Sequence, residues 1–141
     1  MTIAIINTDM NIGPFKIPGN GQNMILNNYA ERNKIIVEEI IPEPFMSNAL
    51  ATTQWVHKKK KLKKVILCSI HQLPQKQKRI EDLINTMDDV EFHFALESIS
   101  GKGSKFLLDC IKEAKMFKNA KTIDSTKTTW LELYKLKQEI G

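Results

Sequence analysis

Short apolar runs alternate with amphipathic stretches four times along this chain of 141 residues. The apolar runs are rich in β-branched and aromatic residues, which is typical of buried strands. The run 64–69 is apolar almost throughout and predicts a central strand of a parallel sheet. Together the runs predict strands at 3–7, 34–40, 64–69 and 90–96, and the amphipathic stretches predict helices at 21–33, 47–62, 75–87 and 100–120.

Apolar positions at helical spacing indicate which face of each predicted helix is buried. The second helix has Ser47 as a suitable N-cap. The expected inner faces comprise Leu26, Tyr29 and Ala30 in the first helix, Leu50, Ala51, Trp55 and Leu62 in the second, Ile80, Leu83, Ile84 and Met87 in the third, and Phe106, Leu107, Cys110, Ile111, Ala114 and Phe117 in the fourth.

Strands and helices in this order predict parallel strands joined by right-handed crossovers. We therefore expect an α/β domain over residues 1–121, with three layers and a four-stranded, mostly parallel sheet. A further amphipathic stretch at 127–140 predicts a helical extension within residues 122–141. Its Trp130 and Tyr134 share one face, which would pack on the domain itself or on the partner subunit of a homodimer.

Composition restricts the class of protein. The hydrophobic fraction of 42% and the charged fraction of 26% are typical of a soluble globular domain. Cys68 and Cys110 lie in apolar runs, which predicts buried thiols in a reducing compartment. The chain has no CxxC or Cys/His cluster, so we expect no metal site, and no motif implies a cofactor. It also has no signal-peptide pattern and no apolar run of roughly 18 residues, which predicts a cytoplasmic protein without membrane contact.

Positive charge is concentrated in one part of the chain, whose overall net charge is +5. Between Glu43 and Glu81 there is no acidic residue, whereas the basic residues there are Lys58, Lys59, Lys60, Lys61, Lys63, Lys64, Lys76, Lys78 and Arg79. Such a surface can attract the phosphates of nucleic acid, nucleotides or anionic lipids. The alternative, which we favour at this point, is a solvated helix end whose lysines interact with the helix dipole.

The stretch 8–23 is a long connection between the first strand and the first helix. A strand-to-helix connection usually takes about two to six residues. Open α/β sheets bind their ligands at the carboxyl ends of the strands, so this loop is a candidate ligand-binding loop. Lys16, Asn20, Gln22 and Asn23 supply polar groups within it. A plain surface connection is the alternative.

The carboxyl ends of parallel strands share one edge of a sheet, and polar residues follow each predicted strand at this edge. A serine, a histidine and two carboxylates together can support acid–base chemistry, although such residues also occur there by chance. The candidate catalytic residues are Glu43, Ser69 and His71, and the candidate ligand-binding residues are Asn7, Thr8, Lys16, Gln22, Asn23 and Glu97.

The three histidines also have simpler interpretations. For His71 we favour the interpretation as an ordinary loop histidine over that as a catalytic residue. His93 alternates with Phe92 and Phe94 in a predicted strand, so it is expected to face a helix or solvent. His57 has no carboxylate nearby in the sequence.

The order of the predicted elements resembles the catalytic domain of the serine recombinases, the resolvases and invertases, over about residues 3–120. The residues that carry the resemblance are Gln22, Leu26 and Tyr29 on the first helix, Ser69 and Leu73-Pro74 after the third strand, the run Phe94 to Glu97, and Gly101 to Phe117. The resemblance implies a resolvase-like fold.

Recombinase activity is not expected. That family has an arginine and a nucleophilic serine where the first strand ends, and this chain has Ile6-Asn7-Thr8-Asp9 there. Phosphoryl transfer of this kind also needs several arginines around the phosphate, and the whole chain has two, Arg32 and Arg79.

A second set of residues is similar to the small bacterial proteins of the sporadic carbohydrate cluster family. The pattern spans roughly residues 3–100 and comprises Gly13, Phe15, Ile17-Pro18, Gln22-Asn23, Tyr29, Glu43, Ser69, Leu73-Pro74 and Phe92 to Glu97. Members are found among genes for surface polysaccharide such as O-antigen, so the resemblance implies a role in that pathway. It implies no particular reaction.

These observations lead us to expect a protein of surface-polysaccharide biosynthesis that binds a sugar or nucleotide sugar at the strand-end edge; whether it is an enzyme stays open. The alternative is a non-catalytic interaction or regulatory module that contacts nucleic acid or a partner biosynthetic enzyme through its lysine-rich face. A third possibility is a scaffold subunit whose apolar last helix contacts another biosynthetic enzyme.

Overall fold

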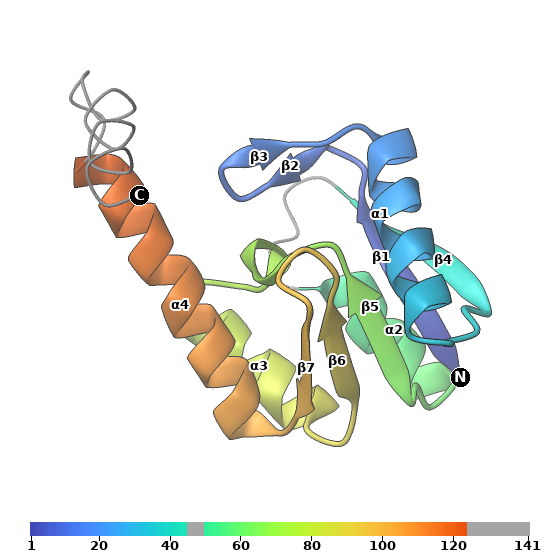
Figure 1. The fold of residues 1–141 in the computed structure, drawn as a ribbon. Helices are drawn as coiled ribbons and strands as arrows, with labels where there is room; N and C mark the ends of the chain where they lie inside the picture. Colours follow the sequence, from blue (N-terminus) through green and yellow to red (C-terminus); the bar gives the residue numbers. More distant parts are fainter. Residues whose placement is uncertain (45–49, 124–141) are drawn as a thin grey trace.

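A five-stranded sheet lies at the centre of the computed structural model, which describes residues 1–44 and 50–123 (Figure 1). β1 pairs in parallel with β4 and β5, and β5 pairs in parallel with β6, whereas β7 is antiparallel to β6. The predicted α/β fold with a mostly parallel sheet is therefore confirmed. In spatial order the strands are β4 (Glu39–Glu43), β1 (Thr2–Asn7), β5 (Lys64–Leu67), β6 (Glu91–Phe94) and β7 (Ile99–Lys102).

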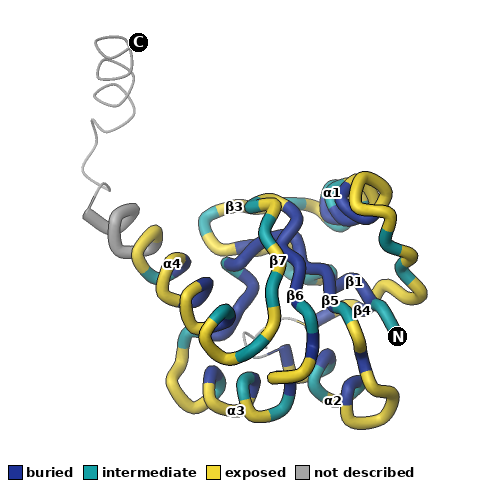
Figure 2. The backbone as a smooth tube through the Cα atoms, turned by 60° about the horizontal axis from the view of Figure 1, so that its bottom comes forward, coloured by how far each residue is buried: buried dark blue, intermediate teal, exposed yellow. Residues whose placement is uncertain are grey.

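Helices cover both faces of this sheet (Figures 1 and 2). α1 packs on one face, and α2, α3 and α4 pack on the other. Because side chains alternate along a strand, Ile3 and Ile5 belong to the core beneath α2 and α3, whereas Ala4 belongs to the core beneath α1. The helices are α1 (Gly19–Arg32), α2 (Ala51–Lys59), α3 (Gln77–Met87) and α4 (Ser104–Ile123).

The predicted central strand and the predicted third helix are confirmed. β5 is the middle strand of the sheet, and Val65, Ile66 and Leu67 are fully buried. In α3, Ile80, Leu83 and Met87 are buried, as their spacing predicts, and Ile84 packs against the same core.

The long connection after β1 contains a small hairpin that the sequence did not predict. Its two strands are β2 (Asn11–Ile12) and β3 (Phe15–Lys16), which pair antiparallel to each other. Gly13 sits in the turn with φ of 59°, a left-handed conformation that glycine adopts without strain. The hairpin folds over the carboxyl edge of the sheet, and α1 follows it at Gly19.

The predicted strand at 34–40 is wrong in position, because the strand is β4 and starts at Glu39. α1 continues to Arg32, and Lys34 then turns the chain with φ of 54°. Ile35 and Val37 pack against the core beneath α1 as part of an irregular connection. Ile35 and Val37 are thus partly buried without joining the sheet, whereas Ile36 is exposed.

The predicted helix start at 100–103 is also wrong. Ile99–Lys102 is β7, a fifth strand, so the sheet is not four-stranded as predicted. A tight turn at Ser98, with φ of 54°, folds β7 back onto β6. Gly101 lies directly over the ring of Phe106, where a Cβ atom would come within 2.5 Å of the ring. The close approach of this strand to α4 therefore depends on the glycine.

The second predicted helix differs in its buried face. α2 buries Thr53 and His57, whereas Trp55 is 61% exposed and Ala51 is exposed. Leu62 is buried as expected, but it lies beyond the helix end. The predicted N-cap Ser47 lies outside the described residues, and so does the predicted helix at 127–140 with Trp130 and Tyr134.

Two buried histidines have structural partners. The sequence predicts that His93 faces a helix or solvent, and in the structure it faces the helix α1. Its Nδ1 lies 2.8 Å from the hydroxyl of Tyr29. Its Nε2 lies 2.8 Å from Oε2 of Glu91, and this hydrogen bond holds the pKa of Glu91 below its usual range. His57, without a carboxylate nearby in the sequence, finds Asp89 in space at 3.2 Å.

Both cysteine thiols should be unreactive while the protein is folded. Burial raises the pKa of Cys68 to about 12 and that of Cys110 to about 11. Because the thiolate is the reactive form, neither thiol should react appreciably with an aromatic disulfide reagent at pH 8, and both should react after unfolding in guanidinium chloride. Rapid labelling of either cysteine in the native protein would contradict this burial.

Candidate functional site

The carboxyl ends of β1, β5 and β6 meet at one edge of the sheet, as the parallel topology predicts. Asn7 ends β1, Ser69 follows β5 and Glu97 follows β6. A short 3₁₀ helix, η1 (Ile70–Gln72), turns the chain across this edge after β5. These residues, together with Gln22 of α1, form a continuous network of hydrogen bonds.

The side-chain amide of Gln22 binds the end of β1. Its Oε1 accepts a hydrogen bond from the backbone N–H of Asn7 at 2.7 Å, and its Nε2 donates to the carbonyl of Asn7 at 2.9 Å. The same Nε2 donates to the carbonyl of Ile17 at 2.8 Å, at the end of the hairpin. Gln22 is completely buried, and both of its N–H donors are used. The structure therefore gives Gln22 a structural role, and its predicted ligand contact stays a prediction.

The side chain of Asn7 extends the network in two directions. Its Nδ2 donates to the carbonyl of Asn11 in the hairpin at 3.0 Å, and its Oδ1 accepts from Nε2 of Gln72 at 3.0 Å. Asn7, predicted as a ligand-binding residue, thus connects the hairpin to η1. Gln72 was not predicted, because a glutamine in a loop has no distinctive sequence signal.

Ser69 is buried in a closed arrangement with Glu97. The Ser69 hydroxyl donates to Oε2 of Glu97 at 2.7 Å and accepts from the backbone N–H of His71 at 3.2 Å. Oε1 of Glu97 accepts from the backbone N–H of Ile70 at 3.0 Å. Ser69 also exchanges hydrogen bonds with Gln72 as a capping box, and it is completely buried. A serine in this setting caps η1, and the predicted catalytic role of Ser69 stays a prediction.

Glu43 is directed to the start of α2. Its carboxylate accepts hydrogen bonds from both the backbone N–H and the hydroxyl of Thr53, each at 2.7 Å, and only 2% of Glu43 is exposed. A carboxylate is favourable at a helix amino terminus, because the helix dipole is positive there. Thr8 was also predicted at this edge. Its hydroxyl donates a hydrogen bond to the backbone carbonyl of Glu43 at 3.2 Å. Glu43 is thus a helix cap in this structure and not an exposed acid or base.

His71 lies between two aromatic rings. The centroid of its imidazole is 6.1 Å from that of Phe15 and 5.2 Å from that of Phe117, both in edge-to-face geometry. Gly13 packs on the other part of the residue, since a Cβ atom there would come within 2.4 Å of Cβ of His71. Burial lowers the pKa of His71, and the charges of Glu97 and Glu113 oppose this in part. The imidazole therefore connects the hairpin to α4.

An open pocket of about 580 Å³ lies between the hairpin and the end of β6. Lys16 and Glu97, both predicted from the sequence, are among its lining residues. Phe15 and Leu96 were missed, although they are 45% and 44% exposed. An aromatic residue in a loop rich in glycine and proline is the signal that would have indicated Phe15. The complete lining is Pro14, Phe15, Lys16, Ile17, Leu96 and Glu97.

Asn23 has an unused hydrogen-bond acceptor. It lies in the first part of α1, shortly after the pocket residue Ile17, and its Oδ1 is buried without a partner among the described residues. Buried polar atoms almost always have a hydrogen-bond partner. The predicted ligand-binding role of Asn23 stays a prediction.

Neither a metal-binding cluster nor a membrane-spanning helix is found among the residues that the structure describes. Within residues 1–44 and 50–123, no three His, Cys, Asp or Glu side chains gather into a metal-binding group. Over the same residues, none of the helices has both the length and the apolar character needed to cross a bilayer.

Comparison with solved structures finds the N-terminal catalytic domain of TP901-1 integrase, with a TM-score of 0.58 and 16% sequence identity. The match covers 86% of this chain and 99% of that chain. The predicted likeness to a serine recombinase catalytic domain is confirmed, and at this identity it concerns the fold alone. No known family profile and no curated protein matches the sequence. The similarity to the sporadic carbohydrate cluster family therefore stays a prediction.

Replacing Gln22 with leucine should destabilise the protein by about 2–4 kcal/mol, because three part-buried backbone groups, two of Asn7 and one of Ile17, lose their hydrogen bonds. Gln77 is a suitable control, since it is exposed on α3 and bonds Glu81 at 3.1 Å. Gln77→Leu should change the stability by less than about 0.5 kcal/mol. Urea denaturation measures both changes, and equally small effects would contradict the structural role of Gln22.

The lowered pKa of His71 should make the protein less stable at mildly acid pH. Below about pH 6.5 the unfolded chain binds a proton at this histidine more readily than the folded chain does, so protonation favours unfolding. Glutamine at position 71 has no such proton to bind. The stability of the wild type relative to His71→Gln should therefore fall between pH 7.5 and pH 5.5. A difference that is constant over this range would refute the effect.

Proposed function

We propose that this chain binds a sugar or a nucleotide-activated sugar in the pocket between the hairpin and the end of β6, in the service of bacterial surface-polysaccharide biosynthesis. The observation that carries the proposal is the lining of this pocket, where an exposed aromatic ring, a lysine and a carboxylate come together. A few polar groups on an apolar wall are the usual composition of a small-molecule site.

Phe15 supplies a ring that can pack against the apolar face of a sugar. Its side chain is at the pocket wall and nearly half exposed, and the edge-to-face contact with His71 supports it from behind. Leu96 supplies a second apolar surface. Aromatic rings have a negative face that attracts the polarised C–H groups of an adjacent ring.

Glu97 supplies a carboxylate whose orientation is already set. Ser69 and Ile70 each donate one hydrogen bond to it, one to each oxygen. A carboxylate offers about four acceptor sites, so capacity remains for sugar hydroxyl groups. Because the donors on Ser69 and Ile70 hold the group in place, a ligand would not have to order it on binding.

Lys16 supplies positive charge for a phosphate. It is exposed on β3 and lines the same pocket as Glu97. A lysine ammonium binds phosphate as a point charge, which suits the sugar phosphate or diphosphate of an activated sugar.

We propose ligand binding at this pocket and assign no catalytic step to it. The buried Ser69 hydroxyl and the capping carboxylate of Glu43 are already engaged in hydrogen bonds within the protein. The link to surface polysaccharide is supported by the sequence similarity to the sporadic carbohydrate cluster family. The fold it shares with a recombinase domain does not bear on the substrate.

A thermal-shift screen of nucleotide sugars, sugar phosphates and free nucleotides should give an increase in melting temperature with a sugar-containing ligand. A ligand at 100 times its dissociation constant adds about 2.7 kcal/mol, which is a shift of several degrees in a domain of this size. Calorimetric titration of the best ligand should then show that Phe15→Ala and Lys16→Ala each weaken binding about 3- to 10-fold.

The chain offers matched controls for both variants. Phe117 also contacts His71 but is not among the residues that line the pocket, and Lys34 is an exposed lysine elsewhere. Phe117→Ala and Lys34→Ala should leave the affinity unchanged. If the controls weaken binding as much as the pocket variants do, or if no sugar-containing ligand binds, the proposal is wrong.

A further inference from the structure

The lysine-rich part of the chain is presented at the end of α2, beside an exposed tryptophan. Lys58, Lys59, Lys60, Lys61 and Lys63 are all exposed, and we call this group together with Trp55 the α2 terminus. We propose that the α2 terminus binds single-stranded nucleic acid, with the lysines on phosphates and a base stacked on Trp55.

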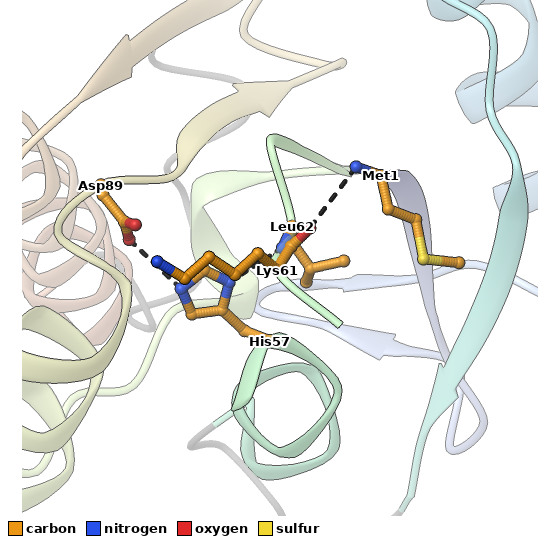
Figure 3. A network of polar contacts seen from close by, with 5 residues as sticks. All are labelled: Met1, His57, Lys61, Leu62 and Asp89. Atoms are coloured by element: carbon orange, nitrogen blue, oxygen red, sulfur yellow. Dashed lines mark hydrogen bonds and ion pairs between the residues drawn. The ribbon is translucent and has the colours of Figure 1, made fainter. Parts of the chain in front are cut away.

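The backbone of this terminus is held in one conformation by His57 (Figure 3). Nδ1 of His57 accepts a hydrogen bond from the backbone N–H of Leu62 at 3.0 Å. This nitrogen therefore carries no proton, and Nε2 carries the hydrogen that it donates to Asp89 at 3.2 Å. The imidazole thus closes the turn from α2 into β5 and ties it to the end of α3.

The amino terminus of the chain holds the same turn from the other side (Figure 3). The amino group of Met1 donates to the carbonyl of Lys61 at 3.4 Å, and the backbone N–H of Lys63 donates to the carbonyl of Met1 at 2.7 Å. The lysines are thus carried on a fixed turn. A basic surface with an ordered backbone loses less entropy on binding than a disordered tail does.

Trp55 is the second independent feature. The sequence pattern places it on the inner face of its helix, but the structure turns it outward, where it is the most exposed aromatic side chain among the described residues. Nζ of Lys59, one helical turn further on, lies 5.8 Å from the centroid of the indole ring. A large exposed aromatic residue beside unpaired positive charge suits a ligand that has both flat rings and phosphates.

The charges of the terminus are available for a ligand. Among the described residues, Lys64 pairs with Glu91 at 3.8 Å, whereas the five exposed lysines of the terminus make no ion pair. They follow one another around a helix end and into an extended residue, Lys60, rather than along one face. A flexible single strand can follow charges arranged in this way, whereas a flat membrane surface would meet only some of them.

The α2 terminus is separate from the sugar pocket. It leads into the start of β5, next to the starts of β1 and β6, at the amino edge of the sheet. The pocket lies at the carboxyl edge. The inference therefore goes beyond the proposed sugar binding and does not depend on it.

Fluorescence anisotropy of a labelled 12-nucleotide oligothymidylate tests the proposal, with the full chain titrated at 50 and 200 mM salt. Trp55→Ala should weaken binding about tenfold, and Trp55→Phe, which keeps a ring, should weaken it less. In Trp130→Phe, which leaves Trp55 as the single tryptophan, the oligonucleotide should quench the fluorescence. Because Trp55 is exposed, the melting temperatures of Trp55→Ala and Trp55→Phe should stay close to that of the wild type, which confirms folding.

The salt dependence separates specific contacts from overall charge. Lys60→Gln/Lys61→Gln should reduce the slope of log K against log salt by about 1.4, since each contact with a single-stranded phosphate contributes about 0.7. The control Lys34→Gln/Lys105→Gln removes the same charge from exposed positions elsewhere and should leave the slope unchanged.

Three results would overturn the proposal. One is the absence of oligothymidylate binding at 50 mM salt. Another is binding that both double variants weaken equally and that Trp55→Ala does not affect, which would mean attraction by net charge alone. The third is binding of vesicles made of phosphatidylglycerol through Trp55, without binding of the oligonucleotide.

Discussion

The buried amide of Gln22 is the interaction on which the carboxyl edge of the sheet depends. One side chain satisfies both backbone groups of Asn7 and the carbonyl of Ile17, and so fixes where β1 ends and where the hairpin ends. These groups are part-buried, and each of the three hydrogen bonds contributes about 0.5–1.5 kcal/mol to stability. The position of the hairpin, which forms one wall of the pocket, therefore depends on Gln22.

From Asn7 the same network continues through Gln72 to Ser69 and Glu97, so that most polar residues at this edge are engaged with one another. These hydrogen bonds change the role that the polar residues have at this edge. The residues predicted as acid–base catalysts hold loops and helix ends in place. The groups that remain available to a ligand lie on the hairpin and beside Glu97. A hydrogen-bonded polar network thus lies next to the open, partly aromatic pocket.

Strong periodicity made part of this structure predictable. β5 and α3 have long, consistent patterns, and parallel topology alone places Asn7, Ser69 and Glu97 at one edge. The failures have physical causes. Ile35 and Val37 pack, partly buried, against the core beneath α1 and are outside the paired strands. β7 is a short strand with a glycine that allows close packing, and Trp55 is an aromatic residue outside the core. Hydrogen bonds within the protein decide which site residues remain available to a ligand. Sequence patterns do not predict these hydrogen bonds.

An NMR titration tests the central claim most directly, because it reports binding and its location together. The ¹⁵N-labelled protein would be titrated with the nucleotide sugar that gives the largest thermal shift. If the sugar binds in the pocket, the amide signals of Phe15, Lys16, Ile17, Leu96 and Glu97 should move and reach saturation, while those at the end of α2 stay in place. Signals that move only at other parts of the molecule, or no change with any sugar-containing ligand, would contradict the account.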